Sequence, residues 1–262
     1  RPPPGDAGIQ TPEGAKRSGH GGIQLLWDGK QSLEDLRSAA AAKEFPGNAP
    51  PMRSLPLAFL ADGELERLCA ANADATHPHP KARAASLVVA AAAQWLVVRG
   101  GETGRVLVAA LERLEASGLR DSATEQYLRS VDALPDWHDY GPRLRDMPVE
   151  VHNRLCGPQP MRTSPPRNGI DSDAMRTAGA VLYVLKWHQG PTDALGAAVY
   201  VGGDVDSTAA LVLGMVGGSS GLGLGEPGGI PWFYLEEVEG VEYLAARARA
   251  FESWLQQQPA EP

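Results

Sequence analysis

Helical periodicity runs through almost the whole chain, and the alternation of apolar and polar residues that marks half-buried strands is nearly absent. The spacing of apolar and small residues predicts helices over residues 33–43, 64–75, 80–98, 105–116, 123–133, 149–155, 174–187, 192–201, 206–217 and 235–255. Helices without strands bury their apolar faces only against one another. The pattern therefore predicts an all-α domain with loop insertions.

Proline and glycine mark the predicted boundaries. Three prolines within residues 45–53 exclude a regular helix through that loop, whereas Pro80 suits the first position of the long helix that follows it. Gly240 allows a kink in the last helix. The Gly- and Pro-rich start of the chain reads as an extended arm. We therefore expect an N-terminal arm with a short helix over residues 1–44 and a helical domain over residues 45–262.

Composition excludes several classes of protein. A chain of 262 residues with 43% hydrophobic and 21% charged residues is typical of a soluble globular domain. Its net charge of −8, without a basic run, argues against a nucleic-acid partner. The longest apolar stretch, residues 87–98, is too short to span a bilayer. Cys69 and Cys156 lie far apart and match no metal spacing, so we expect the cytoplasm or another reducing compartment.

Residues 202–208, Gly-Gly-Asp-Val-Asp-Ser-Thr, form the most distinctive polar run. Asp204 and Asp206 are carboxylates one residue apart, which repel each other and need either a cation or an exposed position. Carboxylate and hydroxyl oxygens suit Mg²⁺, Mn²⁺ or Ca²⁺ better than zinc. The alternative is that Asp204 or Ser207 only caps the helix that follows.

Three further polar loops, residues 47–53, 76–80 and 168–171, also precede predicted helices. Backbone N–H groups and the positive ends of those helices could converge there on an anionic ligand. Within these loops either His77 or His79 is a candidate ligand contact or proton carrier, and Asn48 is a candidate contact to ligand hydroxyls or phosphate.

Each of these residues also has a structural interpretation. Thr76 could help to cap the helix from Pro80, leaving His77 on the surface, and Asn48 could close an Asx-turn. Arg53 could pair with a core carboxylate or with a phosphate. Asp171 and Asp173 are expected to cap the helix that begins at residue 174.

Taken in chain order, these motifs resemble the ADP-ribosylglycohydrolase family. The residues that carry the resemblance are 47–53 (Gly-Asn-Ala-Pro-Pro-Met-Arg), 55–58 (Leu-Pro-Leu-Ala), 76–80 (Thr-His-Pro-His-Pro) and 202–207 (Gly-Gly-Asp-Val-Asp-Ser), with weaker likenesses at 17–21 and 168–170. The usual family forms are G-N-G-x-x-M-R, P-L-G, T-H and G-G-D-T-D-[TS]. The match extends from about residue 45 to about residue 221.

The resemblance implies an all-α, orthogonally packed helical bundle with two Mg²⁺ ions at its centre. It also implies Mg²⁺-dependent hydrolysis of an ADP-ribose glycosidic bond, on a protein or a small molecule, with a carboxylate handling the proton. By motif matching, the metal ligands would be Asp204, Asp206 and Ser207. The ADP-ribose cleft would be lined by Gly47, Asn48 and His77, together with Gly19, Gly21, Gly169 and Ile170.

The chain departs from the family pattern at its N-terminal side. The family's G-D-A-x-G and T-D-D motifs, which supply the other metal ligands and an acidic group, have no counterpart beyond a passing likeness at residues 5–8, and no Asp-Asp pair occurs. The sequence therefore carries half of a dinuclear site. The other half could lie upstream of Arg1, lie on a second chain, or have been lost, leaving a catalytically degenerate structural or interaction subunit.

Overall fold

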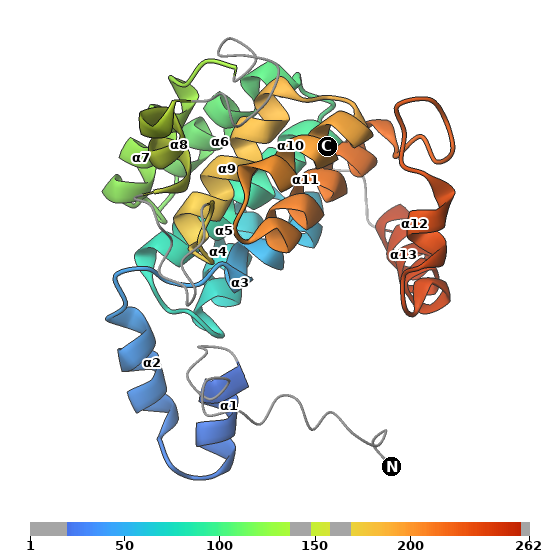
Figure 1. Cartoon of the computed structure of the whole chain (residues 1–262). Coiled ribbons are helices and arrows are strands. Elements are labelled where there is room, and N and C mark those ends of the chain that lie inside the picture. The colour runs from blue at the N-terminus through green and yellow to red at the C-terminus, as the bar shows by residue number, and fades with distance from the viewer. Residues whose placement is uncertain (1–19, 137–147, 158–168, 258–262) are drawn as a thin grey trace.

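The computed structural model describes residues 20–136, 148–157 and 169–257, and the regular structure in these residues is helical (Figure 1). The elements are α1 (His20–Trp27), α2 (Leu33–Ala41), α3 (Ala49–Met52), η2 (Leu55–Phe59), α4 (Asp62–Asp74), α5 (Pro80–Ala93), η3 (Gln94–Val98), η4 (Thr103–Arg105), α6 (Val106–Glu115), α7 (Ser122–Asp132), α8 (Val149–Cys156), α9 (Ala174–Trp187), α10 (Pro191–Val201), α11 (Val205–Ser220), α12 (Trp232–Glu236) and α13 (Val241–Gln256). The predicted all-α fold is confirmed.

Two helices, α5 and α9, form the centre of the core. They pack against each other, and α4, α6 and α7 cover α5 while α7, α10 and α11 cover α9. Every residue of 84–93 in α5 and of 177–185 in α9 is buried. Most of these residues are small, which lets the helix axes approach closely. At Gly179 of α9 the ring of Tyr127 leaves no room for a Cβ atom.

Helix α5 continues without a break into η3, which is π-helical, so the helical run covers Pro80–Val98. This run is 19 residues long and apolar enough to cross a membrane by length and composition. The apolar stretch of residues 87–98, considered alone, was too short to indicate this. Burial decides its role, because 72% of its most apolar window lies inside the molecule. The run is therefore the core helix of this domain.

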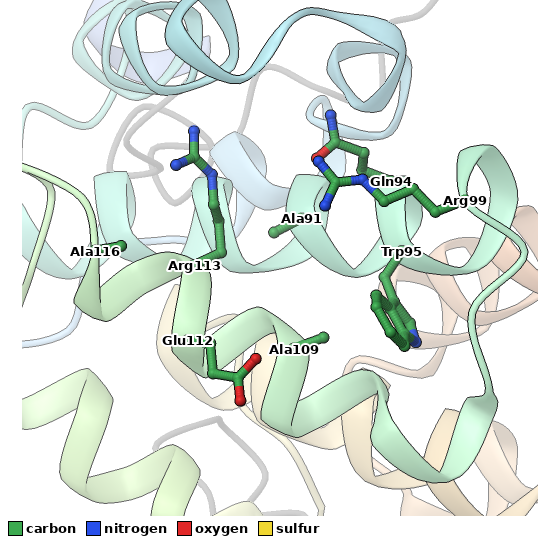
Figure 2. A pocket seen from close by; sticks show the side chains of 8 residues that line it. All are labelled: Ala91, Gln94, Trp95, Arg99, Ala109, Glu112, Arg113 and Ala116. Carbon is green, nitrogen blue, oxygen red and sulfur yellow. The ribbon is translucent and has the colours of Figure 1, made fainter.

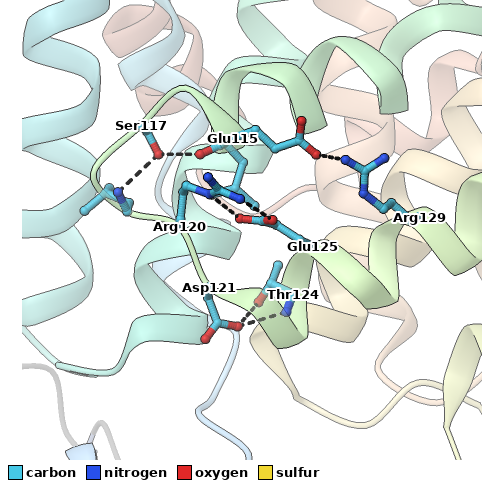
Figure 3. A network of polar contacts seen from close by, with 9 residues as sticks. Glu115, Ser117, Arg120, Asp121, Thr124, Glu125 and Arg129 are labelled. Carbon is cyan, nitrogen blue, oxygen red and sulfur yellow. Dashed lines mark hydrogen bonds and ion pairs between the residues drawn. The ribbon is translucent and has the colours of Figure 1, made fainter.

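Side-chain caps explain where several helices begin. Ser32 and Asp35 form a reciprocal capping box at α2, and Asp173 accepts a hydrogen bond from the backbone N of Arg176 at 2.8 Å at the start of α9. The cap at Asp173 was predicted. Asp171 does not cap this helix, because its Oδ1 accepts a hydrogen bond from the N of Ser172, outside the helix. At α7, Asp121 accepts bonds from the backbone N and the hydroxyl of Thr124 at 2.9 and 2.7 Å (Figure 3). Each cap satisfies backbone N–H groups that have no partner inside the helix.

Two sequence expectations about helix breaks were wrong in detail. The proline-rich loop does contain one helical turn, α3, because its prolines occupy the first helical positions, where the missing N–H group is not needed. Gly240 does not kink a single helix. It adopts a left-handed conformation (φ 74°) that separates α12 from α13 as two helices.

The first two and the last two helices lie outside the packed body (Figure 1). None of α2, α12 or α13 has a buried residue. The C-terminal pair contacts the body through Phe251, whose ring meets that of Phe59 edge-on at 5.4 Å between centroids. The division of the chain at residue 44/45 stays a prediction.

Candidate functional site

Three polar loops meet at the N-terminal end of α9. Gly47 pairs with Asp173, and Ile170 pairs with Gly203, as isolated β-bridges. The second bridge consists of two hydrogen bonds, from the N of Ile170 to the O of Gly202 (3.0 Å) and from the N of Asp204 to the O of Ile170 (2.8 Å). The segment before α9 therefore joins the 47–53 loop to the 202–208 run, which are far apart in the sequence.

Two carboxylates lie close together in the 202–208 run. The side chains of Asp204 and Asp206 are hydrogen-bonded to each other. Burial opposes ionisation of Asp204, but hydrogen bonds to Asp206, Ser172, Asn48 and Ser207 outweigh it, so its pKa is lowered. The bond to Asp204, together with burial, raises the pKa of Asp206. Asp206 is therefore the first of the two carboxylates to take up a proton as the pH falls.

Asn48 connects this pair to the core. Its Nδ2 donates to Oδ2 of Asp204 at 2.8 Å and to the hydroxyl of Thr177 at 3.0 Å, and both Asn48 and Thr177 are buried. Asp204 stands at the N-cap position of α11, but its carboxylate makes no capping hydrogen bond. The helix-cap alternative for Asp204 and the Asx-turn alternative for Asn48 are therefore not what the structure shows.

Glycine is required where the backbones cross. A Cβ atom on Gly169 would overlap the backbone of Gly202 and Gly203, and one on Gly203 would overlap the carbonyl oxygen of Ile170. Gly169 and Gly203 also have φ values of 126° and 81°, which disfavour other residues. The position of the Asp204–Asp206 pair thus depends on two residues without side chains.

His77 lies beside Gly47 and is buried, with 4% of its surface exposed. A Cβ atom on Gly47 would lie 2.8 Å from Nε2 of His77, so the loop and the ring are in close contact. Nδ1 of His77 lies 2.9 Å from the hydroxyl of Thr76. Burial, and then the charges of Lys43 and Arg53, lower the pKa of His77 to about 4. The ring is therefore neutral at pH 7.

The neutral His77 predicts a pH dependence of stability. Its folded pKa of about 4 lies below the usual value of about 6.5, so below pH 6.5 the unfolded chain binds more protons than the folded one. We expect its stabilising contribution to be complete above pH 6.5 and to fall as the pH drops toward 4. Urea unfolding of the wild type and His77→Gln, at several pH values from 4 to 7.5, measures this difference. Equal pH slopes for the two proteins would contradict it.

Several other predicted contacts are placed differently. Thr76 does not cap α5, because His79 does so through a hydrogen bond from the N of Lys81 at 3.1 Å. Arg53 pairs with neither a carboxylate nor an open site, since it donates to Asn72 and Thr76. Gly21 lies in α1, away from the packed body (Figure 1), so it is not among the residues brought together here. Gly19 lies outside the described residues.

Ser207 lies in the first turn of α11 and is hydrogen-bonded to Asp204. Within residues 20–136, 148–157 and 169–257, no group of three His, Cys, Asp or Glu side chains is arranged to hold a metal ion. The donors present are therefore two carboxylates with neighbouring hydroxyl groups. This set resembles part of the ligand shell of a hard cation, and it is unlike the closed nitrogen and sulfur shell of structural zinc.

A separate pocket of about 220 Å³ lies between the end of the core helix and α6 (Figure 2). Its lining includes Gln94, Trp95, Arg99 and Arg113, but none of the predicted site residues. The guanidinium of Arg99 is already bonded to Asp62 and Gln94. The pocket is therefore distinct from the loop cluster at α9.

Comparison with known proteins identifies the family. The sequence model of the ADP-ribosylglycohydrolase family matches residues 5–260, nearly the whole chain. The chain belongs to the ADP-ribosylglycohydrolase family. Neither the comparison with curated proteins nor that with solved structures gave a match. Family membership indicates hydrolase activity of the glycohydrolase type, and the resemblance found in the sequence motifs is confirmed.

Three residues of the candidate site in this member of the ADP-ribosylglycohydrolase family were not identified from the sequence. Ser172 and Thr177 contribute hydroxyl groups next to Asp204 and Asn48, and Arg176 lies three residues after the cap Asp173. Ser172 directly follows the polar loop of residues 168–171 that the sequence had marked. That adjacency was the one available signal, because nothing in its spacing separates Thr177 from the buried residues around it.

Proposed function

We propose that this chain hydrolyses an ADP-ribose glycosidic bond with the help of Mg²⁺, on an ADP-ribosylated protein or small molecule. The observation that carries the proposal is the hydrogen-bonded pair of Asp204 and Asp206, held by the buried Asn48 in a chain of this family. Two carboxylates kept this close cost free energy unless a proton or a cation lies between them. Their presence where three polar loops meet therefore supports a binding role.

The donor set fits one Mg²⁺ ion. Mg²⁺ usually binds through one or two carboxylates and keeps several waters, and Asp204, Asp206 and the hydroxyl of Ser207 supply such ligands. When bound, the ion would supply charge stabilisation and help to orient ribose hydroxyls and a water molecule. A second ion would need carboxylates in addition to those that the described residues bring together.

The chain's own residues would then position the sugar. Asn48 fixes the carboxylate of Asp204, so the pair is oriented before the ligand arrives. Gly47 exposes backbone at the edge of the loop, next to a His77 ring that carries no charge at pH 7. Asp206 takes up a proton before Asp204 as the pH falls, because its pKa is raised and that of Asp204 is lowered.

A second candidate is a degenerate relative that binds ADP-ribose without cleaving it. The observation that favours it is that no third His, Cys, Asp or Glu side chain joins Asp204 and Asp206 among the described residues. Release of ADP-ribose from ADP-ribosylated protein and from a small ADP-ribosyl conjugate, measured with Mg²⁺ and with EDTA, distinguishes the two. Release that depends on Mg²⁺ supports the hydrolase. Binding of ADP-ribose without release in either condition supports the degenerate relative.

A further inference from the structure

Two cationic side chains lie against one aromatic ring at the edge of the loop cluster. The ammonium of Lys81 lies 5.5 Å from the ring centroid of Phe45, and the guanidinium of Arg176 lies 5.9 Å from it. Phe45 comes two residues before Gly47. The backbone N of Ala174 donates to the O of Pro46 at 2.9 Å, which fixes this edge to the start of α9.

Arg176 stands at an unfavourable place for a cation. It is the third residue of α9, where the helix dipole is positive and acidic side chains are preferred. Among the ion pairs and side-chain hydrogen bonds of the described residues, none involves its guanidinium. The guanidinium instead lies directly over the backbone of Gly157, where any Cβ atom would overlap it. Packing holds this cation in place.

The nearby carboxylate of Asp173 does not explain the position of the Arg176 guanidinium. Asp173 is buried, and its Oδ1 accepts a hydrogen bond from the backbone N of Arg176, but its Oδ2 is buried with no hydrogen-bond partner among the described residues. A guanidinium placed to neutralise Asp173 would pair with that oxygen. It does not, and burial keeps the pKa of Asp173 raised although Arg176 and Lys81 both favour its charge. No acceptor among the described residues thus takes up the guanidinium donors, which we assign to a ligand.

We infer that Arg176, assisted by Lys81, forms an anion-binding subsite that takes the diphosphate of an ADP-ribosyl ligand. The inference rests on the proposed function, because it assumes that the ribose lies at Asp204 and Asp206. A planar guanidinium presents paired N–H donors that match phosphate oxygens. Lys81 donates one hydrogen bond to the O of Glu44 at 3.0 Å and retains two further N–H donors. Arg176 would then select ligands that carry phosphate.

Binding measurements on the intact chain test the subsite. Dissociation constants for ADP-ribose, ADP, inorganic pyrophosphate and adenosine would be measured by calorimetry for the wild type, Arg176→Gln, Arg176→Lys and Lys81→Gln. We expect Arg176→Gln to weaken the three phosphate ligands about 10-fold or more and to leave adenosine unchanged. Arg176→Lys should restore part of the loss, and Lys81→Gln should cause a smaller one. Arg129→Gln, which removes an exposed arginine of α7, is the matched control.

Because pyrophosphate, ADP and adenosine are tested separately, the measurements distinguish failure of this inference from failure of the proposed function. Pyrophosphate binding that is lost in Arg176→Gln upholds the anion subsite even where the wild type releases no ADP-ribose. Equal affinity of wild type and Arg176→Gln for ADP and pyrophosphate overturns the inference, and so does an equal loss of adenosine binding, which would indicate a structural role. A wild type that binds none of the phosphate ligands also overturns it. Circular dichroism melts of each variant verify folding.

Discussion

Replacing Asp206 by asparagine is expected to reduce Mg²⁺-dependent release of ADP-ribose at least about 100-fold, because loss of a directly ligating carboxylate should exceed the 10- to 100-fold effect of losing a residue that only supports a ligand. The substitution keeps the shape of the side chain and removes its negative charge. Thermal stability should stay the same or rise, since the repulsion between Asp204 and Asp206 is relieved. The measurements are initial rates across a Mg²⁺ titration and a melting curve.

Asp171→Asn is the matched control for this substitution. Asp171 lies on the segment before α9, and its Oδ1 accepts a hydrogen bond from the backbone N of Ser172 at 2.8 Å. The control should retain most of the activity, because that carboxylate is not part of the hydrogen-bonded pair. Full Mg²⁺-dependent activity in Asp206→Asn would refute the assignment of the metal site to Asp204 and Asp206.

Gly203→Ala is expected to lower the free energy of unfolding by about 3 kcal/mol or more. Two costs combine at this position. The left-handed φ of 81° is strained for alanine, and the new Cβ atom would overlap the carbonyl oxygen of Ile170. Relief requires breaking the bridge between Ile170 and Gly203, so the run that carries Asp204 would shift. Urea unfolding gives the free energy.

Gly221→Ala separates strain from overlap. Gly221 ends α11 with a φ of 78°, close to that of Gly203, but a Cβ atom added to it would meet no other group within 4 Å. Its cost should therefore be only the backbone strain, about 1 kcal/mol. Equal decreases in the free energy of unfolding for the two variants would show that the close backbone approach at Gly203 adds no cost to the substitution.

Local chemistry allowed much of the fold to be predicted. The bounds of α9 agree with the expected 174–187 because Asp173 has the side chain that an N-cap requires. The turn at α3 was missed because the same prolines that break a helix interior are accepted at its start. The break at Gly240 could not be told from a kink, since both use glycine and only the surrounding packing decides its φ.

Only the site residues that belong to a family motif could be predicted from the sequence. The family motifs marked Gly47, Asn48 and Asp204, but the contact between Asn48 and Asp204 joins positions 156 residues apart in sequence. No local pattern encodes such a contact. Arg176 could not be predicted as a site residue for a related reason, because an arginine within a helical stretch is common. Only the structure shows that its guanidinium lies against an aromatic ring without an ion pair to any described residue.

The backbone bridges at the start of α9 also bear on how the site opens. Gly47 and Gly203 are both bonded to the segment that leads into a helix buried from residue 177 to residue 185. Loops attached in this way share the local stability of the core and do not open as independent lids. A ligand that enters should therefore meet a preformed surface, and its binding energy should raise the melting temperature of the whole domain with little spent on ordering loops.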